Sequence, residues 1–364
     1  MIENARGRAA IAGLTKGIIE MMRFRKCWIL LCLVGMLCVG AKGAAAISQS
    51  EPSLSEPVFV LLYHPDEENF VSAFRDHLVW LKENGYQTIS PEALVDYLEG
   101  KEISLPAKPI LLTFDDGTIE NYEIAYPMLK EFGYTGISFV LTSPFFIDLS
   151  KKCWWREVDR SGILAIENHS HSHGQMWTGP QIMDFFSGEY PDDFYLIKGV
   201  DWVLGAPLYE YDYELISRRY FPDRRITRRC VKYVAQNGGE DFFKREGWRE
   251  ELFQVAEDFR SHHQERGFYE TKGRKHFRFR TELYRSKRII ERTIGHGKQV
   301  EFFAYPWGVY DEELIDQLKG YDYRGAFTTN EGGNYPGGDP FKINRFVITS
   351  EMTVEDLAAI LRVD

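Results

Sequence analysis

The feature that most constrains the fold of this sequence is an apolar run that ends abruptly in two carboxylates. Residues 110–114 read Ile-Leu-Leu-Thr-Phe, and Asp115, Asp116 and Gly117 follow directly. A short apolar run closed by a turn residue is typical of a buried strand. Carboxylates are rarely buried unless they are paired or bind a metal, and in α/β folds the chemistry lies at the carboxyl ends of strands. The doublet therefore predicts either a metal-assisted hydrolytic site or an N-cap for the next helix, because Asp is also a favoured cap.

Strands and helices alternate on both sides of this run. A second apolar run, residues 58–63, ends at His64. Apolar residues spaced three and four apart predict helices, whereas short apolar runs predict strands. The predicted helices are 70–84, 90–98, 121–132, 281–293, 311–318 and 353–361, and the further predicted strands are 135–141, 163–166, 300–306, 325–328 and 343–348. Such alternation implies a parallel sheet with right-handed crossovers, so the predicted fold class is α/β.

This periodicity is lost between residues 177 and 278, a stretch rich in aromatic residues, Arg and Asp. Within it, only 209–220 and 248–262 look helical. We interpret the stretch as a long, mostly helical insertion over the mouth of one domain that spans residues 58–364. The polar residues 47–57, with two prolines, are interpreted as a linker that precedes this domain.

The first 46 residues have the layout of a secretory signal peptide with an additional upstream segment. Arg23, Arg25 and Lys26 precede an uncharged stretch over 27–41, and the alanines at 44–46 provide a cleavage site. The uncharged stretch is shorter than the roughly 20 residues that span a bilayer; a membrane anchor is the alternative. We therefore expect an exported protein, periplasmic or secreted, with no stable membrane span after cleavage.

Charge and cysteine content narrow the possible functions. The formal net charge of −10 argues against a protein that grips nucleic acid along a basic face. Three of the five cysteines lie in the predicted signal segment. The other two, Cys153 and Cys230, either pair in an oxidising compartment or remain buried thiols. Their spacing does not suggest a cysteine metal site.

A histidine-rich segment follows the predicted strand 163–166. His169 and His173 are four residues apart, so on a helical turn or in a tight loop they face the same side. Two histidines and one carboxylate suit a catalytic divalent metal that keeps a position open for water. His171 is expected to point elsewhere. The alternative is a set of ordinary loop histidines with incidental metal affinity.

These two segments together resemble the signature of the polysaccharide deacetylases of carbohydrate esterase family four. Residues 113–117, Thr-Phe-Asp-Asp-Gly, resemble its first motif, and residues 169–173, His-Ser-His-Ser-His, resemble its second. The resemblance covers roughly residues 58–175 and 280–361. It implies a distorted, incomplete (β/α) barrel of about seven strands that hydrolyses N-acetyl groups of N-acetylhexosamines in a polymer, releasing acetate.

The resemblance also implies roles for individual residues. Asp115 is expected to be the general base that activates water. Asp116 is expected to bind a divalent metal together with His169 and His173, with Zn²⁺ the expected metal and Co²⁺ or Ni²⁺ as alternatives. Amide hydrolysis also needs an acid for the leaving amine and a charge sink for the oxyanion.

The general acid departs from the common family pattern, because no histidine follows His296 in the sequence. Residues 60–64, Val-Leu-Leu-Tyr-His, resemble the opening strand of exported poly-N-acetylglucosamine deacetylases. This resemblance implies His64 as the general acid. The alternative is a histidine that caps or packs at a strand end.

The third motif departs as well. Residues 303–308, Phe-Ala-Tyr-Pro-Trp-Gly, lack the arginine that orients the catalytic base in many members. We expect Trp307 to line the acetyl or sugar pocket and the backbone N–H of Tyr305 to help hold the oxyanion. We hypothesise that Arg345 replaces the missing arginine, whereas a surface ion pair would explain Arg345 equally well.

The sequence thus predicts a metal-dependent hydrolase that acts on an N-acetylglucosamine-containing polysaccharide. An esterase that removes O-acetyl groups, as from xylan, and a non-catalytic carbohydrate-binding relative are the alternatives. In the insertion, the aromatic residues are expected to form either a small core or a platform for sugar rings; they are Trp202, Tyr209, Tyr211 and Tyr213.

Overall fold

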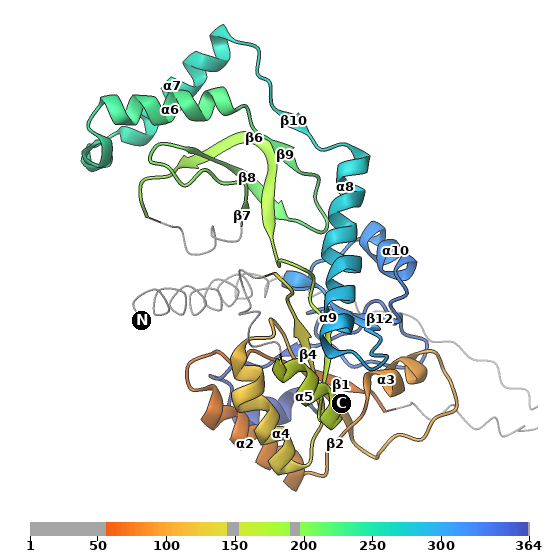
Figure 1. Cartoon of the computed structure of the whole chain (residues 1–364). Helices are drawn as coiled ribbons and strands as arrows, with labels where there is room; N and C mark the ends of the chain where they lie inside the picture. The colour runs from red at the N-terminus through yellow and green to blue at the C-terminus, as the bar shows by residue number, and fades with distance from the viewer. Residues whose placement is uncertain (1–55, 144–152, 190–196, 363–364) are drawn as a thin grey trace, which may run out of the picture. The chain divides into compact units, whose positions relative to one another are not determined.

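A parallel sheet is the framework on which this chain is built (Figure 1). Its strands follow the order β12-β11-β5-β4-β3-β1-β13, and the short β2 pairs with β3 beside this path. All its pairings are parallel, as the alternation of strands and helices predicts. The strands are β1 (Phe59–Tyr63), β2 (Gln87–Thr88), β3 (Pro109–Phe114), β4 (Gly136–Val140), β5 (Leu164–Asn168), β11 (Phe302–Ala304), β12 (Gly325–Phe327) and β13 (Phe346–Val347).

The sheet curls into a partial barrel, but its strands do not pair continuously around the whole ring. β12 and β13 are the two ends of its path, and an isolated parallel bridge between Phe327 and Ile343 joins the β12 end to the segment that leads into β13. The architecture is therefore a distorted, incomplete (β/α) barrel with a seven-strand path, which confirms the predicted fold. The strand predicted over 343–348 is shorter than expected, because it consists of this bridge and the two residues of β13.

The computed structural model describes residues 56–143, 153–189 and 197–362. The predicted signal peptide and nearly all of the predicted linker lie outside these residues. Residues Pro57–Asp364 form one compact unit. Among the described residues, we find no helix with the length and apolar character that a membrane span requires.

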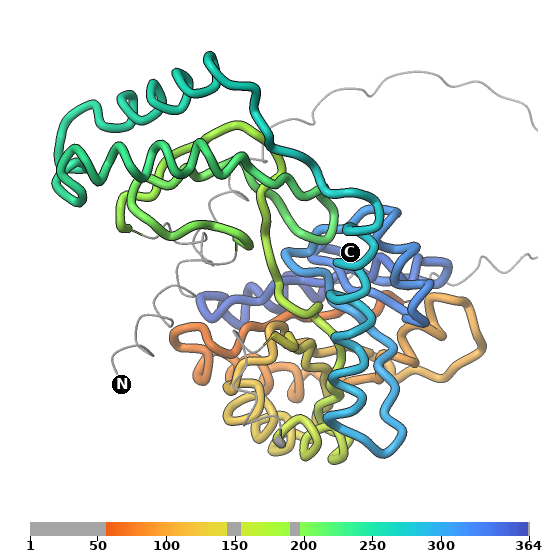
Figure 2. Tube along the Cα trace, turned by 45° about the horizontal axis from the view of Figure 1, so that its top comes forward, coloured from red at the N-terminus to blue at the C-terminus, as the bar shows by residue number. Residues whose placement is uncertain are grey.

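Helices connect the strands of the sheet (Figures 1 and 2). The segments α8, η5 and α9 follow one another without a break, so the helix predicted over 281–293 begins earlier, at Lys272. The helical segments of the barrel are α2 (Phe70–Glu83), α3 (Pro91–Leu98), η1 (Asn121–Ala125), α4 (Tyr126–Phe132), α5 (Cys153–Ser161), α8 (Lys272–Phe279), η5 (Arg280–Arg285), α9 (Ser286–Ile294), η6 (Pro306–Gly308), α10 (Glu312–Gly320) and α11 (Val354–Ile360).

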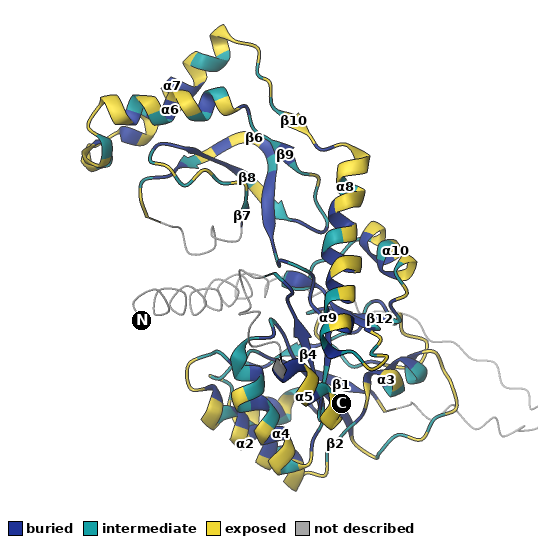
Figure 3. Ribbon diagram, in the orientation of Figure 1, coloured by how far each residue is buried: buried dark blue, intermediate teal, exposed yellow. Residues whose placement is uncertain are grey.

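The strands of the sheet are largely buried (Figure 3), and alternate residues of several of them, such as β1, β3 and β11, belong to two different hydrophobic clusters. In β1, Leu61 and Tyr63 pack with the surrounding helices, whereas Val60 packs with residues inside the barrel. The buried face of α3 joins this inner cluster and so helps to fill the interior. Because both faces of the sheet are covered, its strands read as continuous apolar runs in the sequence.

The sequence explains why the first two helices form where they do. In α2, Phe74 and Leu78 lie four residues apart and are completely buried. Burial of a side chain of this size contributes about 1.5–3 kcal/mol. At the start of α3, the Ser90 hydroxyl accepts the N–H of Ala93, a cap that typically stabilises by about 1 kcal/mol. The predicted start at Ser90 is confirmed.

The insertion combines a sheet with helices. β6 pairs with β7 and β8, and α6 and α7 lie side by side and contact this sheet (Figure 2). The helix predicted over 248–262 is confirmed as α7, but the prediction of a helix over 209–220 is wrong. Tyr alternates with an acidic residue over 209–213, which is the two-residue period of a strand. The segments are β6 (Gln175–Phe185), β7 (Ile197–Lys198), β8 (Pro207–Tyr213), β9 (Tyr220–Phe221), α6 (Arg224–Gln236), η4 (Gly239–Lys244), α7 (Trp248–His262) and β10 (Phe268–Tyr269).

The insertion has its own hydrophobic core. Some of its aromatic residues therefore belong to a small core, which is one of the two alternatives that the sequence left open. Tyr209 is buried in that core, and Trp202 packs against it. Tyr213 lies outside the core and contacts Trp307 of the barrel, with ring centroids 5.6 Å apart. Cys230 is a buried free thiol in the same core; the side chain of Cys153 lies outside what the structure describes.

Candidate active site

The strand register brings the predicted site residues to one edge of the sheet. Tyr63 of β1 is opposite Phe114 of β3, so His64 and Asp115, the next residue of each strand, emerge beside one another. Phe303 of β11 is likewise opposite Asn168 of β5. The carboxyl ends of these parallel strands therefore deliver an imidazole, two carboxylates and the histidine loop to a common place.

Arg345 holds Asp115 in a buried, two-pronged ion pair. Its two terminal nitrogens each lie 2.8 Å from one carboxylate oxygen of Asp115. The same guanidinium donates to the carbonyl of Thr328 at 2.7 Å and to the hydroxyl of Thr113 at 3.3 Å. The Arg345 side chain is completely buried, so the alternative of a surface ion pair is excluded. Four donated bonds fix the guanidinium, and the guanidinium in turn fixes Asp115.

The pKa of Asp115 reflects this arrangement. Burial alone would raise the pKa, but the charge and the hydrogen bonds of Arg345 lower it to about 2. The carboxylate is thus ionised at neutral pH although only 4% of Asp115 is exposed. An ionised, immobile carboxylate is suited to accept a proton.

Asp116, His169 and His173 form a cluster suited to a metal ion. Their candidate ligand atoms all lie within 4.8 Å of one another. Nε2 of His169 is 3.6 Å from the Asp116 carboxylate, and Nε2 of His173 is 3.9 Å from it. These distances are too long for hydrogen bonds. In a metal site, each ligand atom lies about 2 Å from the ion, so the distances between ligand atoms are somewhat shorter than those seen here. Small side-chain movements would therefore let the three groups bind one divalent metal.

Hydrogen bonding and burial prepare both histidines as ligands. Nδ1 of His169 lies 2.9 Å from the carbonyl of Ala304. Because a carbonyl only accepts, Nδ1 donates to it, and Nε2 is the ring nitrogen that faces the Asp116 carboxylate. Burial lowers the pKa of His173 to about 4, so this ring is neutral at neutral pH. Neutral imidazoles are the form that binds metal.

The acidic turn has an unusual backbone. Asp116 has a φ of 67°, in the left-handed region. Gly117 follows with a φ of 64°, and a Cβ on it would lie within 2.8 Å of three Val140 atoms, including its Cα. Only glycine fits this position. The turn therefore separates the directions of the two carboxylates, with Asp115 toward Arg345 and Asp116 toward the histidines.

His64 lies close to the acidic turn and is half-buried. Its Nδ1 is buried, with no hydrogen-bond partner among the residues that the structure describes. Asp66, two residues further on, was not predicted as a site residue. Burial and the charge of Asp116 raise the pKa of Asp66 to about 6, while His64 opposes this rise. The charge of Asp66 therefore acts on the same region as that of Asp116, and an acid three residues after a strand end was the only sign of this in the sequence.

The third motif contributes one side chain to the site and another to the core. The Trp307 ring contacts His173, with centroids 4.7 Å apart, and Trp307 is partly exposed. Tyr305 is completely buried, and its hydroxyl donates to the carbonyl of Phe341. The Tyr305 N–H donates to the carbonyl of Phe327 at 3.0 Å. The expectation that this N–H helps hold an oxyanion is therefore wrong, because sheet pairing with β12 already uses it.

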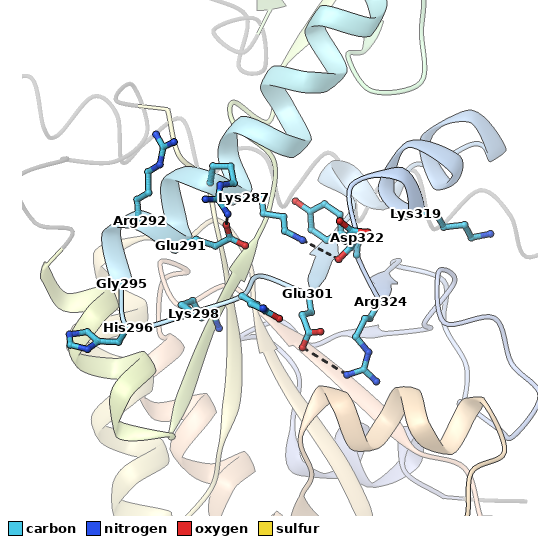
Figure 4. Close-up of a pocket in the computed structure, with 14 residues that line it drawn as sticks. Lys287, Glu291, Arg292, Gly295, His296, Lys298, Glu301, Lys319, Asp322 and Arg324 are labelled. Atoms are coloured by element: carbon cyan, nitrogen blue, oxygen red, sulfur yellow. Dashed lines mark hydrogen bonds and ion pairs between the residues drawn. The ribbon is translucent and has the colours of Figure 1, made fainter.

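A cavity of about 800 Å³ lies elsewhere in the barrel (Figure 4). Its lining includes Glu301 and Arg324, which precede β11 and β12, so it is at the opposite end of these strands from the carboxylates. Several of its charged side chains already have hydrogen-bond or ion-pair partners. Lys287 donates to the carbonyl of Asp322, and Arg324 contacts Glu301. This cavity is not the candidate active site.

The comparisons with known proteins agree with the motifs. Residues 102–185 match the family model described as polysaccharide deacetylase. This segment contains the acidic turn and the histidine loop. Over these residues, about a quarter of its length, the chain is therefore similar to polysaccharide deacetylases.

Curated relatives match over short stretches. YxkH of Bacillus subtilis is 44% identical over 69 residues, which are 19% of this chain and 24% of that protein. The poly-β-1,6-N-acetyl-D-glucosamine N-deacetylase of Escherichia coli K12 is 32% identical over 119 residues, covering 28% of this chain and 18% of that protein. The chain thus spans a quarter or less of the length of these two relatives.

A solved structure supports the fold over a longer range. A de-N-acetylase from Aggregatibacter actinomycetemcomitans superposes with a TM-score of 0.54 at 19% identity. The likeness covers 84% of this chain and all of that one. At 19% identity, this likeness supports the fold alone.

Proposed function

We propose that this protein is a metal-dependent deacetylase that removes N-acetyl groups from an N-acetylglucosamine-containing polysaccharide and releases acetate. The observation that carries the proposal is the pairing of two differently held carboxylates. Arg345 holds the Asp115 carboxylate, the proposed base, in a buried ion pair, while Asp116 lies with His169 and His173. The named E. coli relative acts on poly-β-1,6-N-acetyl-D-glucosamine, which supports this substrate class.

The proposed reaction has two proton transfers that involve side chains of this protein. A divalent metal bound by Asp116, His169 and His173, with Zn²⁺ proposed, would act as a Lewis acid that makes water easier to deprotonate and the acetyl carbonyl easier to attack. Asp115 accepts the proton of the attacking water. His64 donates a proton to the sugar nitrogen as the C–N bond breaks. The products are acetate and a free amine.

We propose further that Trp307 forms one wall of the pocket for the acetyl group or its sugar. Its ring contacts His173 and is partly exposed, so it borders the space beside the metal cluster. Tyr213 of the insertion extends this aromatic surface. Aromatic faces are suited to the apolar faces of sugar rings.

We also propose that the protein acts after export, in the periplasm or outside the cell. The support is the charged, then uncharged, then alanine-rich order of residues 23–46. A polysaccharide substrate agrees with such a location.

Acetate release from a panel of polymers tests the function. The purified chain from residue 47 onward is loaded with Zn²⁺ or Co²⁺ and incubated with chitooligosaccharides, poly-N-acetylglucosamine, peptidoglycan and acetylxylan. We expect acetate from an N-acetylglucosamine polymer. Release from acetylxylan alone would replace the proposal with an O-acetyl esterase, and metal binding without any release would favour a carbohydrate-binding protein.

A further inference from the structure

The histidine loop is held in a conformation that it would not adopt alone. Ser170 has a φ of 75° and His173 a φ of 48°, both in the left-handed region that disfavours residues with a side chain. A strained backbone persists where surrounding groups over-determine it. Within the loop, the His173 N–H donates to the Ser170 hydroxyl at 3.1 Å. The remaining support comes from outside the loop.

A buried glutamate on η5 provides much of this support. The Glu282 carboxylate accepts the backbone N–H groups of His171 and Ser172, at 3.1 and 3.0 Å. It also accepts the Ser172 hydroxyl at 2.9 Å. Both N–H groups lie between the two metal-ligand candidates, so Glu282 fixes the segment that sets the separation of His169 and His173.

The insertion supplies the charge that allows this glutamate to be buried. Nζ of Lys198, on β7, lies 2.9 Å from Glu282 and also contacts Glu214, which follows β8. The Ser172 hydroxyl reaches Glu214 at 3.2 Å. Both carboxylates are 3% exposed and Lys198 is 32% exposed. Two buried carboxylates therefore share one lysine beside the loop.

The residue after His173 is suited to this close approach. A Cβ on Gly174 would lie 2.6 Å from the Glu214 carboxylate and 2.8 Å from Cε of Lys198. Real Cβ atoms do not approach other atoms so closely. The absence of a side chain at Gly174 thus lets groups from the insertion pack directly against the histidine loop.

We propose that Glu282 and Lys198 are positioning residues that set the geometry of the metal site, so that the insertion is part of the catalytic apparatus. This inference rests on the proposed function only in that it takes Asp116, His169 and His173 as metal ligands. Removal of a group that orients metal ligands without binding the metal itself typically lowers metal affinity or activity by 10- to 100-fold.

Metal binding by the full-length protein tests the proposal without any substrate. Two variants are used: Glu282→Gln, which keeps the shape of the side chain, and Lys198→Met, which keeps most of its length and removes the ammonium group. We expect Zn²⁺ affinity, measured by competition with a chromophoric chelator, to fall roughly 10- to 100-fold in Glu282→Gln and about 10-fold in Lys198→Met. The Co²⁺ absorption spectrum should change in both, because ligand geometry sets it.

Lys342→Met is the matched control. Lys342 is 35% exposed and pairs with Glu312 at 2.8 Å, so it resembles Lys198 in exposure but contacts no residue of the loop. Its Zn²⁺ affinity and Co²⁺ spectrum should equal those of the wild type. Circular dichroism and thermal unfolding show which variants are folded; if Glu282→Gln is not, Lys198→Met decides.

The outcomes separate this inference from the proposed function. Wild-type Zn²⁺ affinity and an unchanged Co²⁺ spectrum in folded Lys198→Met would overturn the positioning role. A wild-type protein that binds Zn²⁺ but releases no acetate would refute the proposed function and leave the comparison of metal affinities valid. A wild-type protein that does not bind Zn²⁺ would overturn both.

Discussion

Replacement of Arg345 by alanine tests the part of the site that depends most on the fold. The substitution leaves the Asp115 carboxylate, which is 4% exposed, without its cationic partner. Removing one partner of a buried ion pair costs about 3–5 kcal/mol, and we expect a loss in that range for the free energy of unfolding near neutral pH. Burial then dominates the pKa of Asp115 and raises it, so the base is more often protonated. We expect kcat to fall about 100-fold, since a small misplacement of a catalytic group has effects of that order.

The assay is acetate release as a function of pH, together with urea unfolding. The acid limb of the activity profile should move to higher pH in Arg345→Ala. Adding Asp115→Asn should recover much of the lost stability and none of the activity, because the uncompensated charge is gone but so is the base.

Arg75→Ala is the control for this prediction. Arg75 forms the same two-pronged contact with Glu131, at 2.7 and 2.9 Å, but both side chains are exposed. Exposed pairs contribute little, so its unfolding midpoint and activity should hardly change. Turnover in Arg345→Ala within about threefold of wild type, with an unshifted pH profile, would refute a positioning role for this arginine.

Three further predictions follow from the site and the core. Asp116→Ala should abolish Zn²⁺ binding measured by calorimetry, whereas Asp115→Asn should bind Zn²⁺ normally and release acetate at least 100-fold more slowly; full activity in Asp115→Asn would contradict the assigned roles. His64→Gln should likewise keep Zn²⁺ affinity and lose about 100-fold in kcat, and an unchanged kcat would leave His64 as a packing residue. Burial lowers the pKa of His77, although its bond to the carbonyl of Met352 opposes this. Below pH 6.5 the unfolded chain therefore binds a proton that the folded chain does not, so the urea midpoint should fall more between pH 7 and pH 5 in the wild type than in His77→Gln; an equal fall in both would count against this explanation.

Features that depend on local sequence were the most predictable. The apolar runs before His64 and Asp115 became β1 and β3, because strands buried on both faces must be continuously apolar. The four-residue spacing of His169 and His173 predicted two rings on one side of a loop, and the parallel sheet then placed Asp116 beside them.

Features that depend on long-range pairing were not visible in the sequence. Arg345 lies 230 positions from Asp115, and the sequence alone left a surface ion pair as its equal alternative. The link from Glu282 to the histidine loop spans 110 positions and had no local signal. Tyr305 was misread for a related reason, since only the sheet register reveals that its N–H already pairs with β12.

The strand pairings that join the two ends of the sheet have a consequence for the order in which this protein folds. Ile343 makes the bridge to β12, and Phe346 and Val347 pair with β1, so the five residues from 343 to 347 complete the ring. Arg345 lies in the middle of them. During synthesis, which proceeds from the N-terminus, Asp115 is therefore made long before its counter-ion. The Asp115 carboxylate gains its buried ion-pair partner only when residues 343–347 dock, so completion of the barrel and completion of the candidate site coincide.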